Sequence, residues 1–163
     1  MIILITGLPS SGKTTLARMV SHLFLERGIP HVWFDGKDLR EIFEIHGYER
    51  ENLLRFSKFV SNLSRVLSRK GFIVLISAVM PYSEMVEIVA PDMTILLECD
   101  IEKLKKRGEN YERAVRGEIE LPGVNVPYEK PKAVDLVLKT CEEGVEDSFE
   151  KIVEFLKMEG VIS

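Results

Sequence analysis

The feature that most constrains this chain is a glycine loop close to its start, Gly7-Leu8-Pro9-Ser10-Ser11-Gly12-Lys13-Thr14. The apolar run 2–6 precedes the loop, and an amphipathic stretch at 13–27 follows it. Two glycines at this spacing let the backbone curl, so that successive N–H groups face inward at the positive end of a helix. A strand, a loop and a helix in this order are the required context of a phosphate-binding loop. The sequence therefore predicts that this segment binds a polyphosphate.

Individual roles within the loop follow from charge and chemistry. We expect Lys13 to reach the β- and γ-phosphates of ATP as a point charge, and the Thr14 hydroxyl to be a ligand of Mg²⁺. The phosphate-binding segment extends from Gly7 to Thr15, with Thr15 itself interpreted as helix packing. The alternative is an ordinary glycine turn that caps a helix and leaves the lysine exposed.

Beyond the loop, short apolar segments alternate with stretches of helical period, which indicates an α/β fold. We expect one domain over residues 1–163, a P-loop kinase with a five-stranded parallel sheet in the order 2-3-1-4-5 and helices on both faces. Ligands of such open sheets bind beyond the carboxyl ends of the strands, so functional residues should follow strands one to four. The expected strands are 2–6, 31–34, 72–78, 94–99 and 134–139. The expected helices are 13–27, 38–46, 50–70 and 145–158.

Composition excludes several other classes of protein. A net charge of -4 offers no field that would attract nucleic acid. No apolar run reaches the roughly 18 residues needed to span a bilayer, so we expect a cytoplasmic protein with no membrane partner. Cys99 and Cys141 show no paired spacing, and both are interpreted as buried small apolar residues rather than a disulfide or a zinc site. Glutamine is absent while Lys and Glu are abundant, a bias that hints at a thermophile.

An acidic residue ends the second expected strand and should project toward the phosphate loop. Asp35 could accept the proton of an attacking hydroxyl, or hold Mg²⁺ through water. Asp35 and Asp38 could instead cap the following helix. Arg40, one turn into that helix, could clamp an anionic acceptor or remain a solvated surface charge.

A basic and polar stretch follows the fourth expected strand and is interpreted as a lid at about 105–125. Arginines on a closing segment suit phosphoryl transfer, because they neutralise charge on the group in flight. Arg107, Arg113 and Arg116 are the candidates. A charge run of this kind is also typical of a wet helix face.

Taken together, these motifs resemble the adenylylsulfate kinase family over almost the whole chain. The similar segments are GLPSSGKTT, DGKDLR at 35–40, REN at 50–52, Pro81-Tyr82, Arg107, RGEI at 116–119 and PYEKP at 127–131. The resemblance implies transfer from ATP·Mg²⁺ to the 3′-hydroxyl of adenylylsulfate, which gives 3′-phosphoadenylylsulfate. It implies Asp35 as catalytic base and Arg107 on the ATP adenine. It also implies an acceptor site made by the residues Arg40, Asn52, Pro81, Tyr82 and Leu121. Related kinases are commonly dimers, so a homodimer is the expected assembly.

The chain departs from the family pattern on the acceptor side. Lys37 replaces the second acid of DGD, Glu49 stands where the family has an arginine, and Leu121 replaces an aromatic residue. The lid segment is also shortened to RGENY at 107–111. A kinase of another small hydroxyl compound or nucleoside is therefore the first alternative. A nucleotide-binding regulatory protein is the second, although strand three carries no acid of the kind that motor and switch ATPases use.

Overall fold

The computed structural model describes residues 1–163 and contains one parallel sheet of five strands in the order β2-β3-β1-β4-β5. The strands are β1 (Ile2–Gly7), β2 (His31–Asp35), β3 (Ile73–Ser77), β4 (Met93–Leu97) and β5 (Leu136–Leu138). Every pairing is parallel, from β2 on one edge to β5 on the other. The predicted fold class and strand order are confirmed.

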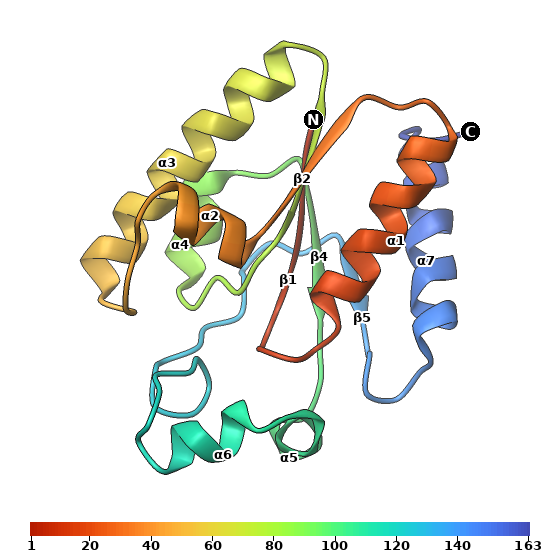
Figure 1. Ribbon diagram of the computed structural model, residues 1–163. Helices are drawn as coiled ribbons and strands as arrows, with labels where there is room; N and C mark the ends of the chain where they lie inside the picture. Colours follow the sequence, from red (N-terminus) through yellow and green to blue (C-terminus); the bar gives the residue numbers. More distant parts are fainter.

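Helices cover both faces of this sheet (Figure 1). On one face lie α1 (Lys13–Glu26) and α7 (Val145–Met158). The opposite face is covered by α2 (Gly36–Ile42), α3 (Arg50–Arg69) and α4 (Ser83–Val89). The seven-residue helix α4 is absent from the predicted set, because one buried face over two turns gives too short a periodic signal.

The central strand β1 explains why the sheet has two cores. Side chains of a strand alternate between its faces, so Ile3 and Ile5 pack toward α1 and α7, while Ile2 and Leu4 pack toward α3 and α4. All four side chains are buried. This burial on both faces is the reason that the segment reads as a continuous apolar run.

Most predicted elements differ from the structure at one or both ends, and the starts of the last strand and of the second helix differ by two residues each. The last strand begins at Leu136, and just before it the Asp135 carboxylate accepts a hydrogen bond from the Thr94 N–H at 2.7 Å. Helix α2 begins at Gly36 rather than at 38, and it ends at Ile42, before Glu44 adopts a φ of 52°. At the start of α2, a side-chain capping box rather than apolar spacing sets the boundary.

Short helical pieces precede and form the first part of the predicted lid, below the carboxyl ends of the strands (Figure 1). They are α5 (Ile101–Leu104), the 3₁₀ turn η1 (Lys105–Arg107) and α6 (Asn110–Val115). A small apolar cluster of their own holds them together, formed by Leu104, Tyr111, Ala114 and Leu121. No helix in the chain is both long and apolar enough to cross a membrane.

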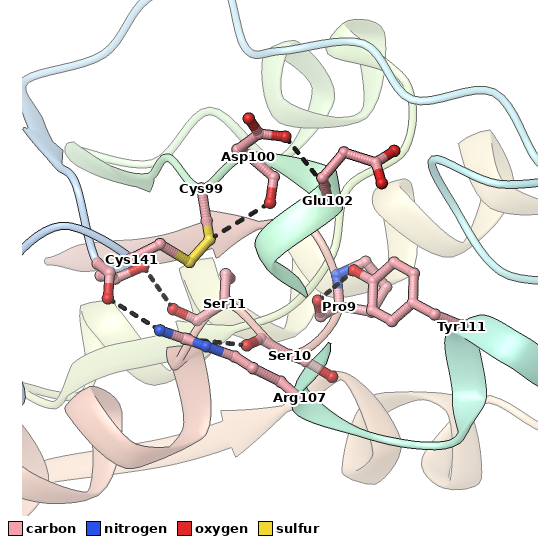
Figure 2. Close-up of a disulfide and its surroundings, with 10 residues drawn as sticks. Pro9, Ser10, Ser11, Cys99, Asp100, Glu102, Arg107, Tyr111 and Cys141 are labelled. Carbon is pink, nitrogen blue, oxygen red and sulfur yellow. Dashed lines mark hydrogen bonds between the residues drawn. A yellow bond between two sulfur atoms is a disulfide. The ribbon is translucent and has the colours of Figure 1, made fainter. Parts of the chain in front are cut away.

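The expectation for the two cysteines is wrong. Cys99 and Cys141 are both half-buried and form a disulfide, with Cα atoms 5.2 Å apart (Figure 2). The first follows β4 and the second follows β5, and these strands are neighbours in the sheet. A sequence separation of 42 residues gives no sign of this proximity.

Candidate active site

The glycine loop joins β1 to α1 and has the backbone that its sequence predicts. Gly7 and Gly12 have φ of 152° and 102°, which side-chain-bearing residues rarely adopt. A Cβ at Gly7 would lie 2.6 Å from the Leu97 carbonyl oxygen of β4. Glycine is therefore required at the first position of the loop on two independent grounds.

Lys13 is the only buried lysine of the chain, and it is the first residue of α1, directly after the second glycine of the loop. Its Nζ donates to the Leu8 carbonyl oxygen at 2.7 Å, and only 9% of the residue is exposed. Desolvation lowers the pKa of Lys13 to about 7, because burial penalises the charged ammonium. A buried cation without a counter-ion is suited to receive a phosphate.

A cavity of about 530 Å³ opens beside the loop and is lined by residues from Ser10 to Leu16. The exposed Thr14 and Thr15 lie on its wall, together with Arg107 of η1. The opposite wall is formed by Thr140 and by the residues Val145 and Ser148 of α7. The expectation that functional residues follow strands one to four missed this wall, since Thr140 follows β5.

Arg107 bridges the two walls of the cavity. Its guanidinium donates to the Ser10 carbonyl oxygen at 3.2 Å and to the Thr140 carbonyl oxygen at 3.1 Å. The structure thus brings Arg107 to the phosphate loop, although 97 residues separate it from Ser10.

Asp35 ends β2 at the same edge of the sheet and is half-buried. Its Oδ1 accepts from the Asp38 N–H at 2.8 Å, and the Asp38 carboxylate accepts from the Asp35 N–H at 3.1 Å. This reciprocal capping box starts α2 two residues early. Both carboxylates therefore accept hydrogen bonds of the capping box, and Asp35 Oδ2 is left without a protein partner.

On the acceptor side, Arg40 and Asn52 are both half-buried and held locally. The Arg40 guanidinium lies 4.4 Å from the centre of the Tyr48 ring and donates to the Gly47 carbonyl oxygen at 3.2 Å. Asn52 lies in the first turn of α3 and donates to the Glu49 carboxylate at 3.4 Å. Glu49, which stands where the family has an arginine, thus contacts Asn52, a predicted acceptor residue.

Pro81 and Tyr82 lie between β3 and α4. The Pro81 carbonyl oxygen accepts from the Glu129 N–H at 2.7 Å, which fastens the PYEKP segment at 127–131 to this loop. The Tyr82 ring faces the Arg50 guanidinium, 5.4 Å from its centre, and Arg50 also pairs with Glu84. Arg50, which is not among the predicted acceptor residues, therefore lies beside Tyr82.

Leu121 is placed differently from the other predicted acceptor residues. It packs in the apolar cluster with Leu104, Tyr111 and Ala114, and 7% of its surface is exposed. Its backbone N–H donates to the Asn125 side-chain oxygen at 2.7 Å. In this position the residue holds the lid together.

The loop and cavity together fit ATP with its magnesium ion. The Lys13 ammonium on the cavity wall matches the charge of a polyphosphate, and the exposed Thr14 hydroxyl is an oxygen donor of the kind that Mg²⁺ prefers. The chain has no cluster of three His, Cys, Asp or Glu residues that could hold a metal ion by itself.

Comparison with known proteins agrees with this geometry. The family model for adenylylsulphate kinase matches residues 1–139. A probable adenylyl-sulfate kinase of Aeropyrum pernix is 32% identical over 168 residues, covering 96% of this chain and 92% of the relative. A cytidine diphosphoramidate kinase of Campylobacter jejuni is 26% identical over 164 residues and covers 96% of each chain.

A solved structure shows the same fold. The APS kinase of Mycobacterium tuberculosis, in complex with AMPPNP and APS, superposes with a TM-score of 0.86 at 24% identity and covers 96% of each chain. The family model spans the phosphate loop, Asp35, the predicted acceptor residues and the lid, and it ends before the wall formed by Thr140, Val145 and Ser148. This chain belongs to the adenylylsulphate kinase family.

Proposed function

We propose that this chain is an ATP-dependent kinase that phosphorylates the 3′-hydroxyl of adenylylsulfate to form 3′-phosphoadenylylsulfate. The observation that carries the proposal is the buried Lys13, which has no counter-ion, in a glycine loop of a chain that matches the adenylylsulphate kinase family model. Arg107, on the cavity wall, would lie against the adenine of ATP.

Asp35 would serve as the general base. Its Oδ1 is occupied by the Asp38 N–H, which fixes the carboxylate and leaves Oδ2 to take the proton of the 3′-hydroxyl. The 3′-oxygen then bonds to the γ-phosphorus while the bond from that phosphorus to the bridging oxygen breaks, and ADP leaves. Lys13 and the loop N–H groups stabilise the charge that develops on the phosphoryl oxygens.

Thr14 would hold the magnesium ion that accompanies ATP. The ion supplies charge neutralisation between the β- and γ-phosphates when it is bound. A cytoplasmic location belongs to the same proposal, since ATP is the donor. We also propose a homodimer, which sedimentation of the purified chain would test.

The second candidate is a kinase of another nucleotide-like acceptor. Lys37 and Glu49 replace family residues on the acceptor side, and Glu49 accepts from Asn52. The Campylobacter relative is named for a different acceptor, cytidine diphosphoramidate, at similar coverage. If this chain has diverged from adenylylsulfate kinases, we expect its acceptor to have changed and its phosphate loop to have kept its role.

The decisive experiment measures ADP release from ATP·Mg²⁺ with each acceptor in turn. Release with adenylylsulfate supports the first candidate, and release only with cytidine diphosphoramidate or a nucleoside supports the second. The Lys13→Ala variant is the matched control and should show no release with any acceptor. If the natural chain also releases ADP with none of them, a regulatory nucleotide-binding role replaces both.

A further inference from the structure

Four consecutive carbonyl oxygens of the phosphate loop each accept a hydrogen bond from a side chain. The donors are one residue of α1 itself, two residues of the lid segment and one residue after β5. The pairs are Lys13 to Leu8 at 2.7 Å, Tyr111 to Pro9, Arg107 to Ser10 at 3.2 Å, and Thr140 to Ser11 at 2.7 Å. Figure 2 shows the bonds from Tyr111 and Arg107.

Bonds to these carbonyl groups govern the N–H groups that grip phosphate. A peptide unit is planar, so fixing the carbonyl of one residue also fixes the N–H of the next. The Pro9 carbonyl orients the Ser10 N–H, and the Ser11 carbonyl orients the Gly12 N–H. Ser10 has a φ of 64°, a conformation that costs a residue with a side chain on the order of 1 kcal/mol and needs support from its surroundings.

Tyr111 is suited to a fixed, permanent contact with the loop. Its side chain is fully buried in the lid cluster with Leu104 and Ala114, and its hydroxyl reaches across 102 residues of sequence to Pro9. Burial raises the pKa of Tyr111 to about 12, so the phenol keeps its proton at any working pH. Tyr111 does not line the nucleotide cavity, so its hydroxyl acts on the loop and not on the ligand.

Thr140 plays the corresponding part from the opposite wall. Its hydroxyl donates to Ser11, while its own carbonyl oxygen accepts from Arg107. The next residue, Cys141, is joined to Cys99, which lies between β4 and α5. The segment after β5 is therefore fastened on both sides to elements that surround the loop.

We propose that Tyr111 and Thr140 are positioning residues, which hold the phosphate loop in its phosphate-receiving shape by fixing the carbonyls of Pro9 and Ser11. The inference rests on the proposed function only in requiring that the loop bind phosphate. It also implies that α6 is fastened to the loop rather than swinging freely above it.

The test measures binding of pyrophosphate by calorimetry, because this probe reaches the loop without involving adenine or acceptor. Tyr111→Phe and Thr140→Val each remove one hydroxyl and leave shape almost unchanged. Loss of one such bond should weaken pyrophosphate and ADP by the same factor, about fivefold. Thr140→Ser keeps the hydroxyl and should restore the affinity. In turnover, we expect KM for ATP to rise, with KM for the acceptor unchanged.

A matched control separates positioning from general stability. Ser57 donates a buried hydroxyl to the Leu53 carbonyl oxygen at 2.9 Å within α3, away from the loop. Ser57→Ala should lower the thermal midpoint without changing pyrophosphate affinity. The proposal is overturned if Tyr111→Phe and Thr140→Val bind pyrophosphate as tightly as the natural chain, or if Thr140→Ser fails to restore binding. Failure of the proposed phosphate site is a distinct result, in which Lys13→Ala still binds pyrophosphate.

Discussion

Nucleotide binding by this protein should take up a proton, and Lys13 is the group that receives it. In the free protein, burial lowers the pKa of Lys13 from its usual 10.5 to about 7. A phosphate beside the Nζ atom favours the charged ammonium and returns the pKa toward its usual value. The experiment therefore raises the pH. This deprotonates Lys13 in the nucleotide-free protein but leaves Lys13 charged in the nucleotide complex.

The magnitude follows from the two protonation states. Binding of Mg·ADP should take up about 0.2 proton at pH 6.5 and nearly 1 at pH 8.5, as the free lysine changes from mostly charged to mostly neutral. Affinity for the nucleotide should fall by up to about tenfold for each pH unit above 7. The lowered pKa of the free protein itself corresponds to about 5 kcal/mol of desolvation.

The same group affects the stability of the free protein with the opposite sign. The unfolded lysine keeps its proton up to a pKa of 10.5, whereas the folded lysine loses it above about 7. Between these values the unfolded state binds more protons, so this group makes the folded state more stable as pH rises. Stabilisation by nucleotide should shrink over the same interval.

Calorimetry of Mg·ADP binding in two buffers of different ionisation enthalpy measures the proton count directly. Lys13→Arg is the matched control, since a guanidinium stays charged at every pH and should show no uptake from this position. An uptake near zero at pH 8.5 in the natural chain would refute the reasoning. Equal uptake in Lys13→Arg would assign the proton to another group.

Three further predictions concern the base, the disulfide and the loop glycine. Asp35→Asn should lower kcat by about 10²- to 10⁴-fold with ATP affinity and thermal midpoint unchanged, because the amide oxygen still caps α2; a loss of ATP affinity in titrations would make Asp35 a metal residue instead. Replacing Cys99 and Cys141 by alanine should lower the free energy of unfolding by about 4 kcal/mol, since the bridge closes a loop with a sequence separation of 42; urea titrations with and without a reductant check this, and no difference would mean that the thiols are unpaired in solution. Gly7→Ala should abolish pyrophosphate binding in calorimetry, because the new methyl would meet the Leu97 carbonyl oxygen 2.6 Å away; unchanged binding would contradict the described loop.

Most of the fold follows from local sequence, because its long elements have strong periodicity. The helix predicted at 145–158 has these bounds in the structure, and the phosphate loop lies where its spacing indicates. The short helices α4 and α6 escape such reasoning, since one or two turns carry too few buried positions to set a period. The early start of α2 depends on the capping box of Asp35 and Asp38. Sequence spacing alone does not decide whether these two acids cap a helix or take part in catalysis.

The missed parts of the site are contacts between distant residues. Thr140 could have been found by extending the edge rule to the fifth strand, since every parallel strand delivers its following residue to the same edge. Tyr111 gives no such signal, because its bond to Pro9 spans 102 residues and depends on how the lid cluster packs. The disulfide is hidden for the same reason.

The two oxygens of the Asp35 carboxylate serve two different ends, and this has an evolutionary consequence. One oxygen holds the start of α2, so a descendant that no longer transfers phosphate would still benefit from asparagine, serine or threonine there. Only the second oxygen requires an acid. A survey of related chains could therefore separate active enzymes from inactive ones at this single position. An acid would indicate a retained general base, and a neutral capping residue would indicate a chain that keeps the fold without the activity.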